Sequence, residues 1–407
     1  MTYTSDILIV GGGLNGPALA LACANAGLSV TVIDRLATGT LASDTFDGRG
    51  YALSLSSQRL LNAIGLWDTV RDTAQPILEV KVTDGKAGEG PAPFMLEFDH
   101  AETDDGPMGY MLEDRFLRRA FLDALASHPK ISQIEGMVTT QNVGPAGAQL
   151  TLADGTVLTG ALIVGCDGRT SGTAQRAGIN RTGWGYKQTA LVCAIAHEKP
   201  HGGCAHQFFM PAGPLAILPL PGNKSSIVWT EKDSVAQDIQ ALDDADYLAV
   251  LKPRFGDFLG DISLAGKRFS YPLGLTLANA FTAPRIALVG DAAHGMHPIA
   301  GQGLNAGLKD VGALAEVLVN AFRRGEDIGR IDVLGRYQQW RRFDVAAQAV
   351  MTDGFNKLFS NDNPLLRFGR DIGMGVVNAI PSMRRAAMRE AAGVSGDLPK
   401  LMQGKPL

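Results

Sequence analysis

The stretch DILIVGGGLNGPALALACANAGLSVTVID, residues 6–34, decides the fold of this chain. Its apolar run at residues 6–10 is typical of a strand that is buried on both faces of a parallel sheet. The Ala- and Leu-rich residues 17–26 predict a helix, and residues 28–33 predict a second strand that ends at Asp34. The stretch therefore predicts one complete βαβ unit.

A glycine-rich motif, Gly11-x-Gly13-x-x-Gly16, connects the first strand to the helix. In such a motif the first glycine permits the tight turn, the second lets the backbone approach a pyrophosphate, and the third lets the helix pack closely on the strand. The motif alone can be a mere turn, but its place in the βαβ unit favours a dinucleotide, without separating FAD from NAD. Free N–H groups at the helix start would meet the pyrophosphate, and Asp34 could accept hydrogen bonds from a ribose. We therefore expect a dinucleotide site that includes Gly11, Gly13, Leu14, Asn15, Gly16 and Asp34.

A second glycine-rich loop follows another apolar strand, within residues 285–305. Its Asp291 could bind ribitol hydroxyls, and the N–H groups of residues 301–305 could face the flavin edge, where negative charge collects on reduction. The alternative is that Asp291 only caps a helix and that the glycines only form turns. Two such junctions, far apart in the sequence, favour one elongated cofactor that is held at both ends.

Composition restricts the class of protein. The chain has 407 residues, of which 45% are hydrophobic, so a sizeable core is expected. Its net charge of −4 argues against a nucleic-acid binder. Four cysteines without a CxxC pair argue against a disulfide framework and favour a reducing cytoplasm. Neither a basic leader segment nor an apolar run of about 18 residues is visible, so we expect neither a secretory signal nor a transmembrane helix.

Two groups of histidines have a spacing that could suit a metal, one within residues 197–206 and one at residues 294–297. No pattern of supporting residues accompanies either group, and the first lies in a glycine-rich loop. We expect loop or packing histidines and no metal.

Together these motifs resemble the class A flavoprotein monooxygenases. Three motifs of that family occur in the family's order: the N-terminal glycine loop, VGCDG at residues 164–168 and VGDAAH at residues 289–294. More narrowly, the chain resembles the ubiquinone-biosynthesis hydroxylases over nearly its whole length. The narrower match is carried by RGYALS (49–54), YKQTA (186–190), GPLAILPL (213–220), HPIAGQGLN (297–305) and LFSND (358–362).

The resemblance implies an FAD-dependent monooxygenase that hydroxylates the aromatic ring of a prenylated phenol in ubiquinone biosynthesis. In that family, reduced FAD reacts with O₂ to give a C4a-hydroperoxide, which transfers its distal oxygen to the ring. The electrons come from NAD(P)H or from a reduced redox protein. Two alternatives stay open: a class A hydroxylase of another small aromatic, and a non-catalytic FAD-binding subunit of a ubiquinone-synthesis assembly.

The resemblance also implies an α/β fold, in which a split Rossmann-like FAD-binding domain carries an inserted, mostly antiparallel β-sheet substrate domain and C-terminal helices. In the inserted sheet we expect one helix, near residues 243–253. The expected boundaries are 1–75, 105–180 and 272–320 for the FAD-binding domain, 76–104 and 181–271 for the substrate domain, and 321–407 for the helical region.

Site residues follow from the same resemblance. Arg49 would lie near the isoalloxazine ring and the backbone of Pro298 would face the flavin, so we expect these two as catalytic residues. Arg49 could instead form only a surface ion pair. The expected pocket walls are Phe208, Phe209, Leu218 and Trp229, of which at least half could be ordinary core. Further expected FAD-binding residues, besides Arg49 and Pro298, are Arg35, Arg115, Asp167, Gly168, Gly290, Asp291, Gly301, Gln302, Gly303, Leu304 and Asn305.

The chain departs from the family pattern at two places. Ala174 stands where the family usually has an arginine near the path of the nicotinamide donor, and Arg176 lies two residues further on. His206-Gln207-Phe208 stands where relatives often have Glu-Arg-Phe, so substrate orientation could differ.

The C-terminal segment at residues 364–390 carries five arginines against two acidic residues, interleaved with apolar residues. Such a basic amphipathic segment on an acidic protein suits a membrane surface or an acidic partner. The alternative is a helix that packs on the FAD-binding domain with solvated arginines. We expect a cytoplasmic protein that takes a prenylated aromatic molecule and binds no nucleic acid. Through these helices it would contact either the inner face of the membrane or other ubiquinone-synthesis proteins.

Overall fold

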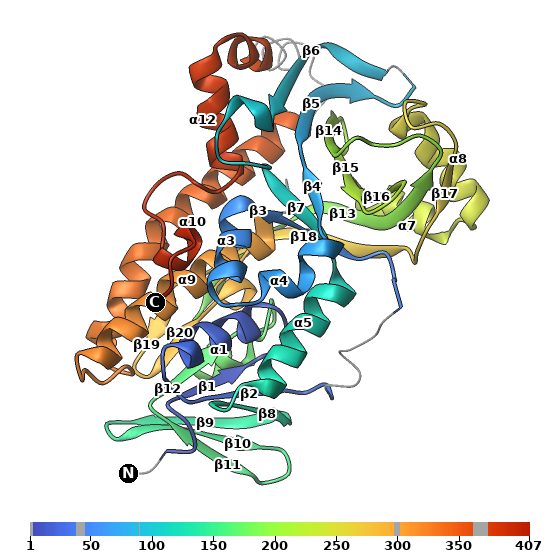
Figure 1. Ribbon diagram of the computed structural model, residues 1–407. Helices are drawn as coiled ribbons and strands as arrows, with labels where there is room; N and C mark the ends of the chain where they lie inside the picture. Colours follow the sequence, from blue (N-terminus) through green and yellow to red (C-terminus); the bar gives the residue numbers. More distant parts are fainter. Residues whose placement is uncertain (1–2, 38–44, 89, 297–301, 361–372) are drawn as a thin grey trace.

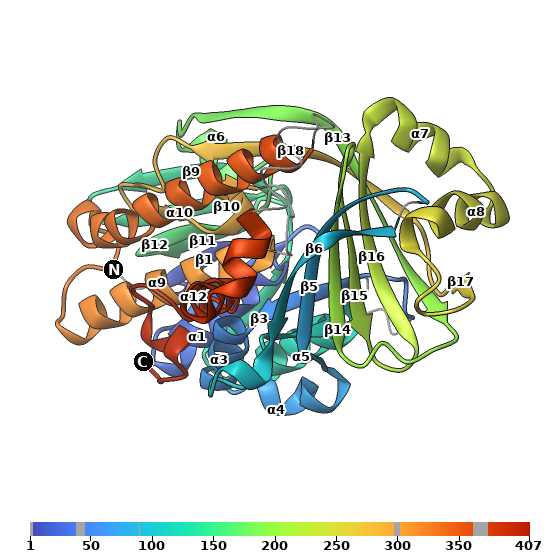
Figure 2. The same ribbon diagram turned by 90° about the horizontal axis from the view of Figure 1, so that it is seen from above.

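Two large sheets form the centre of the molecule, and helices cover them (Figure 1). Seen from above, the parallel sheet with its helices and the antiparallel sheet form separate layers that meet along one side (Figure 2). The computed structural model describes residues 3–37, 45–88, 90–296, 302–360 and 373–407.

The first sheet has six strands in the order β19-β20-β12-β1-β2-β8. Its three central strands, β12, β1 and β2, are parallel, and Ile9 pairs with Val164 on one side and Val32 on the other. The predicted βαβ unit is therefore confirmed, because α1 connects β1 to β2 and packs beside α9. The elements are β1 (Ile7–Val10), α1 (Asn15–Asn25), β2 (Val30–Asp34), β8 (Ile131–Glu135), β12 (Leu162–Gly165), β19 (Thr282–Ala283), β20 (Ile286–Leu288) and α9 (Gln302–Arg323).

The second sheet has nine strands and is mostly antiparallel, in the order β21-β18-β13-β16-β15-β14-β5-β6, with β17 paired to β13. Two helices cover its outer face, α7 and α8, where the sequence predicts only one (Figure 2). The elements are β5 (Glu79–Lys86), β6 (Gly90–Asp99), β13 (Arg181–His197), β14 (Cys204–Met210), β15 (Gly213–Leu220), β16 (Lys224–Lys232), α7 (Asp233–Ala241), α8 (Asp244–Phe255), β17 (Ile262–Leu264), β18 (Phe269–Ala278) and β21 (His294–Gly295).

Two smaller sheets complete the β structure. One, in the order β3-β7-β4, lies between the two large sheets; the other, in the order β11-β10-β9, contains the hairpin of β10 and β11. Their strands are β3 (Gly50–Ser54), β4 (Gln75–Ile77), β7 (Gly109–Glu113), β9 (Val138–Gly144), β10 (Gly147–Leu152) and β11 (Val157–Gly160).

The remaining helices pack around the parallel sheet and along the side of the molecule. The C-terminal part is mostly helical, as the sequence predicts, and α12 reaches up to β6 (Figure 1). Within the described residues, no helix is both long enough and apolar enough to cross a membrane. The helices are α3 (Leu55–Ala63), α4 (Trp67–Val70), α5 (Asp114–Ser127), α6 (Gly172–Arg176), α10 (Ile331–Phe359) and α12 (Pro381–Ala391).

The fold class predicted from the sequence is thus confirmed, with a parallel sheet, an inserted antiparallel sheet and C-terminal helices. The exact domain boundaries stay a prediction. The chain passes from the parallel sheet to the antiparallel sheet within the second glycine-rich junction, because β20 belongs to the first sheet and Gly295 of β21 pairs with Thr276 of β18. That pairing places the junction at the border between the two sheets.

Candidate functional site

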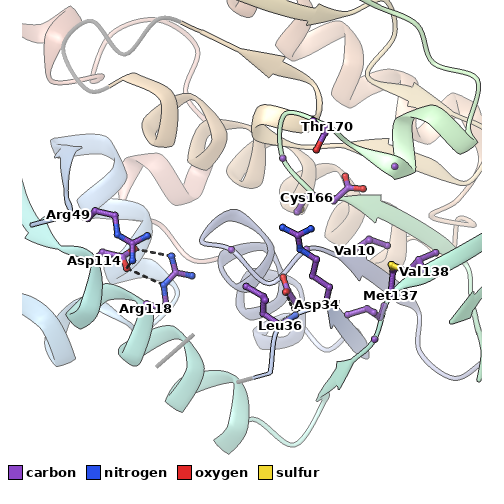
Figure 3. Close-up of a pocket in the computed structure, with 18 of the residues that line it drawn as sticks. Val10, Asp34, Leu36, Arg49, Asp114, Arg118, Met137, Val138, Cys166 and Thr170 are labelled. Atoms are coloured by element: carbon purple, nitrogen blue, oxygen red, sulfur yellow. Dashed lines mark hydrogen bonds and ion pairs between the residues drawn. The ribbon is translucent and has the colours of Figure 1, made fainter. Parts of the chain in front are cut away.

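A cavity of about 740 Å³ lies where the carboxyl ends of β1, β2 and β12 meet (Figure 3). Ligands of open α/β sheets bind at this edge, because the loops that follow the strands diverge there. Val10, Asp34 and Cys166 line it from these strand ends. Its wall also contains five arginines and four aspartates, which gives a net charge of +1. The charged lining residues are Arg35, Arg49, Arg115, Arg118, Arg176, Asp34, Asp47, Asp114 and Asp167.

The first glycine loop packs as the motif predicts. Gly11 has φ +113°, and a Cβ there would lie 2.3 Å from the carbonyl oxygen of Cys166. A Cβ on Gly16 would lie 2.0 Å from the carbonyl oxygen of Gly11. By contrast, a Cβ on Gly13 would meet no protein atom within 4 Å, and Gly13 lines the cavity. Two of the glycines therefore serve packing, and the third leaves room for a ligand beside the backbone.

Asp34 is fixed at the end of β2. Its Oδ2 accepts a hydrogen bond from the N–H of Gly12 at 2.6 Å, and its Oδ1 accepts one from the N–H of Leu36 at 2.8 Å. Figure 3 shows this carboxylate beside the glycine loop. Each carboxylate oxygen has more than one lone pair, so Asp34 can still accept hydrogen bonds from ligand hydroxyls.

An ion-pair cluster at the far end of the cavity holds Arg49 (Figure 3). The Arg49 guanidinium lies 2.8 Å from Asp47 and 3.4 Å from Asp114, and its Cζ lies 5.7 Å from the ring centre of Phe269. Asp114 also pairs with Arg118 at 2.9 Å. Arg49 thus lies at the cavity wall, in an ion-pair cluster and beside Phe269 of the large sheet, with its side chain 40% exposed; its role toward the flavin stays a prediction.

The cluster favours the charged forms of its members. Partial burial opposes the ionisation of Asp47, but hydrogen bonds and the charge of Arg49 outweigh it and lower the pKa of this carboxyl. Burial likewise opposes the charge of Arg49, but Asp47 and Asp114 raise its pKa. Burial and the charge of Asp114 raise the pKa of Tyr51, which donates to Asp114 at 2.8 Å. A fixed positive charge therefore persists at this end of the cavity across the neutral range.

Three further arginines line the cavity. Arg115, a predicted residue, pairs with Glu113 at 2.7 Å and stacks on Phe116, while the predicted Arg35 follows the fixed Asp34. Sequence reasoning missed Arg118, although its spacing of four residues from Asp114 on one helix is a recognisable signal.

Arg176, which lies two residues after the position where Ala174 departs from the family pattern, also lines the cavity. Its buried Nε has no hydrogen-bond partner among the described residues, and burial lowers its pKa. Ala174, by contrast, is fully buried. An anionic ligand in the cavity would give the Arg176 guanidinium a partner.

Asp167 organises its own loop. Its carboxylate accepts a hydrogen bond from the hydroxyl of Ser171. It also accepts two hydrogen bonds from Thr173, one from the N–H and one from the hydroxyl, each at 2.9 Å. Gly168 follows with φ +79°. The side chain of Asp167 thus fixes the start of α6, and both residues line the cavity.

Buried charged side chains stabilise the second junction. Asp310 of α9 is fully buried and accepts hydrogen bonds from the N–H of Gly290 at 2.9 Å, from Nε2 of His294 at 2.6 Å and from Nε of Arg341 at 2.7 Å. Although burial alone would raise it, the pKa of Asp310 is lowered by His294 and Arg341. Asp291 itself is partly exposed and lies 3.5 Å from Arg169.

Asn15 connects the two junctions. Its amide nitrogen occupies the space where a Cβ on Gly290 or on Gly307 would lie, at 2.2 and 2.3 Å. Leu14, also predicted, is buried in the core beside it. The Asn15 side chain therefore packs between the first junction and the residues Gly290 and Gly307.

The first turn of α9 is tied to β3. Asn305 is buried, and its Oδ1 accepts from the N–H of Ser54 at 2.9 Å and from the hydroxyl of Ser57 at 2.8 Å. A Cβ on Gly303 would meet no atom of the described residues within 4 Å, and Leu304 packs against the core. Gln302 begins α9. Two predicted residues, Pro298 and Gly301, lie outside the described residues.

The predicted pocket walls fall on two faces of the large sheet. Phe209 and Leu218 lie on the inner face, packed in clusters with Met374 and with Met111 respectively. Phe208 and Trp229 lie on the outer face, in or against the core beneath α7 and α8. Trp229 is 1% exposed. The four residues therefore do not share one wall, and only the inner pair faces the parallel-sheet side.

The histidines with metal-like spacing have other partners. His197 lies 3.1 Å from the hydroxyl of Ser225, and His201 lies 2.8 Å from the carbonyl oxygen of Leu220. In the part of the chain that the structure describes, no group of three or more His, Cys, Asp or Glu residues could hold a metal.

The cavity fits an FAD molecule on grounds of shape and charge. It runs from the Gly11 turn and Asp34 to Arg49, its charge is positive, and the open flank of Gly13 leaves backbone accessible at the start of a helix. An unpaired Arg176 nitrogen at its wall suits a group that carries phosphates.

Comparisons with known proteins agree with this geometry. Residues 4–353 match the family model described as "FAD binding domain". The chain is 45% identical to the ubiquinone hydroxylase UbiL of Rhodospirillum rubrum, over 99% of this chain and 94% of that protein. It is 35% identical to the 3-demethoxyubiquinol 3-hydroxylase of Escherichia coli, over 96% of this chain and 99% of that protein.

The fold also matches solved structures. The p-nitrophenol 4-monooxygenase PnpA of Pseudomonas putida superposes with a TM-score of 0.81, over 97% of this chain and 99% of that one. Its sequence identity is 19%, so this likeness concerns the fold alone.

Proposed function

The chain belongs to the FAD binding domain family, and on this premise we propose that it is an FAD-dependent monooxygenase that hydroxylates the aromatic ring of a prenylated phenol, a precursor of ubiquinone. The course of the cavity carries the proposal. It starts at the Gly11 turn and Asp34 and ends at Arg49, whose guanidinium faces Phe269 of the large sheet. A dinucleotide that lies along it brings its far end to that sheet.

The residues present have distinct tasks toward FAD. Asp34 accepts hydrogen bonds from the adenosine ribose, and the backbone at Gly13 together with the start of α1 meets the pyrophosphate. Asp291 binds the ribitol chain, and the first turn of α9 offers N–H groups to the flavin ring. FAD, when bound, supplies the activation of O₂ and accepts electrons from NAD(P)H or a reduced redox protein.

The chain itself supplies position and charge. Arg49 is held by Asp47 and Asp114, so its positive charge is in place before the reaction begins and would favour negative charge on a flavin ring bound at this end of the cavity. The inner face of the large sheet offers Phe209 and Leu218 as apolar contacts for the phenol and its prenyl chain. An apolar wall there also excludes water from the reacting atoms.

Product analysis tests this function. Purified protein with bound FAD, NADPH and isotopically labelled O₂ should place one labelled oxygen on a prenylated phenol. Hydroxylation of a short soluble phenol alone would favour a different aromatic substrate. Bound FAD with no product from either phenol, under NADPH or a reduced redox protein, would contradict the proposal and favour a non-catalytic subunit.

The finer proposal concerns the C-terminal helices, which we place against a membrane surface or a partner of the same pathway. Two of the arginines there are already paired, Arg384 with Glu102 at 2.7 Å and Arg389 with Asp105 at 3.5 Å. Arg385 is exposed, next to the exposed apolar side chains of Ile380 and Met383. Among the described arginines of this segment, Arg385 is therefore the candidate for docking; Arg367 and Arg370 lie outside the described residues.

Liposome sedimentation tests that surface. Arg385→Glu should weaken binding to anionic vesicles, because each basic residue near such a surface contributes about 1 kcal/mol. Arg71→Glu, an equal charge change on α4's side of the molecule, serves as the control. If wild-type protein ignores anionic vesicles at low salt, the membrane proposal fails, and the helices are either scaffold or a docking face for a protein partner.

A further inference from the structure

A second cavity, of about 850 Å³, lies on the outer face of the large sheet and shares no lining residue with the first. Its volume falls within the range of about 300–1,000 Å³ that is usual for small-molecule sites. None of the groups assigned to the FAD-dependent reaction lies in it. It is therefore a candidate site for a separate ligand.

The walls of this cavity come from three parts of the chain. Met95, His206 and Met210 point outward from neighbouring strands, because alternate residues of a strand share a face. The end of α8 forms the opposite wall. The N–H of Gly88, in the turn between β5 and β6, donates to the carbonyl oxygen of Pro253 at 2.7 Å and ties that turn to the helix. The cavity thus has a sheet floor, a helical wall and a strap across one side.

Aromatic rings and methionines make the interior apolar. Phe258 stands at the entrance, 39% exposed, and stacks on Phe255 with 5.3 Å between ring centres. Phe208, displaced from the predicted substrate wall, lines this cavity instead. Methionine side chains adapt to irregular apolar ligands, so such walls accept a flexible chain.

His206 is the polar group on the floor. Its ring lies between Phe258 at 4.6 Å and Phe208 at 5.9 Å. Burial, and then the charge of Lys81, lower the pKa of His206 to about 4, so the ring is neutral at pH 7. No described residue hydrogen-bonds with its ring nitrogens. A neutral imidazole carries one N–H, which is left for a ligand.

The charged groups around the cavity favour an anion. Lys81, Lys252 and Arg254 against Asp257 give the lining a net charge of +2, although Arg254 is already paired with the buried Glu231 at 3.3 Å, so the two lysines are the candidates to bind the anion. Lys252 pairs with Asp261, which is 91% exposed, and Lys81 lies 3.5 Å from Glu79 and 4.0 Å from Glu97. Exposed pairs of this kind are weak, so both ammonium groups can take a further anionic partner.

We propose that this cavity binds an amphipathic carboxylate, a molecule with one apolar chain and one anionic head. The chain lies between the methionines and Phe258, and the head accepts hydrogen bonds from Lys81 and from His206. The site is separate from the FAD cavity, so binding should leave the bound flavin in place.

Calorimetry on the FAD-bound protein tests the proposal with two probes that share a chain and differ in the head. Dodecanoate should bind once per chain, and dodecyltrimethylammonium at least tenfold more weakly. Phe258→Glu should weaken dodecanoate binding at least tenfold, and Lys81→Met several-fold. Val235→Glu, a matched apolar-to-acidic change on α7 at a side chain that is 38% exposed, should change nothing.

Flavin absorbance and circular dichroism confirm that each variant is folded. Three results would overturn the proposal: no binding of dodecanoate to the wild type, equal binding of the two probes, or unchanged binding to folded Phe258→Glu. The last result would place the ligand elsewhere, including the inner face of the sheet.

Discussion

The two glycine-rich junctions follow the same local pattern, a buried strand, a tight glycine turn and a helix, yet they are held in different ways. At the first, Gly11 and Gly16 let backbone atoms approach one another, and Asp34 binds the N–H of Gly12. At the second, the fully buried Asp310 binds the N–H of Gly290 and two basic side chains.

The difference has a practical meaning. The first junction depends on the absence of side-chain volume within a short stretch of sequence. The second depends on charges that come from α9 and α10 and converge on one carboxylate. We therefore expect the first to be sensitive to added atoms and the second to lost charge and to acid.

The largest effect should come from adding volume to the first junction. Gly16→Val would place a Cβ 2.0 Å from the carbonyl oxygen of Gly11, a contact with backbone that nothing nearby can relieve, so we expect no folded protein. A Cβ on Gly13 would meet no atom of the described residues within 4 Å, so we expect the matched variant Gly13→Val to fold and to lose FAD. Expression, thermal melting and flavin absorbance separate the two. A Gly13→Val protein with full flavin content would contradict the placement of the pyrophosphate.

The next effect concerns the buried charges of the second junction. Asp310→Asn removes the fully buried carboxylate that pairs with Arg341, which keeps only Asp344 as an acidic partner. Breaking a buried pair costs about 3–5 kcal/mol, and the remaining pair with Asp344 places the expected loss toward the lower end of that range. Denaturant unfolding should show this loss of free energy. Asp332→Asn, which removes an exposed carboxylate paired to Arg330, is the control and should change stability by less than about 1 kcal/mol.

The same variant predicts a pH dependence. The pKa of Asp310 is lower in the folded protein than its ordinary value of 3.8. Its ionisation therefore stabilises the folded state fully above that value, and the contribution is lost as the pH falls through the lowered pKa. The stability gap between wild type and Asp310→Asn should be constant from neutral pH to about pH 5 and shrink below pH 3.8. A gap that instead grows in acid would mean that Asp310 is not the ionised partner.

The next prediction concerns Arg49, at the end of the cavity that lies beside Phe269 of the large sheet. Arg49→Ala should keep the fold and the FAD content but reduce the rate of hydroxylation about a hundredfold, because a positioned positive group of this kind contributes about 3 kcal/mol. Rapid-reaction kinetics check this, with Arg59→Ala, which sits in an ion pair on α3, as the control. An unchanged rate would remove Arg49 from the mechanism.

The smallest effect belongs to Asp34. Asp34→Asn keeps the size of the side chain but weakens the charge-assisted bond to Gly12 and any bond to a ribose. We expect FAD to bind about tenfold more weakly, which corresponds to about 1.4 kcal/mol. Fluorescence titration of the apoprotein measures it. Equal affinity would show that this carboxylate only shapes its own loop.

The two junctions also differ in how much of their structure could be predicted from the sequence. The first junction lies within one short stretch, so its strand, helix and glycine roles could be inferred from local pattern. Asp310 could not, because its partners Gly290, His294 and Arg341 meet it only after α9 and α10 pack together. The orientation of the side chains on the large sheet could be predicted in part. Phe208 and Phe209 are neighbours on one strand, so alternation alone requires that they point to opposite faces.

The position of Asn15 has a consequence for how this chain can change over time. Its amide occupies the space beside both Gly290 and Gly307, so the three positions form one interdependent set. Alanine at Gly307 should be tolerated only after Asn15 becomes smaller, and a larger residue at position 15 has no room while α9 stays in place. Substitutions at these sites are thus epistatic: the order in which they arise decides whether each is neutral or harmful. Combinatorial libraries that vary position 307 should vary position 15 with it.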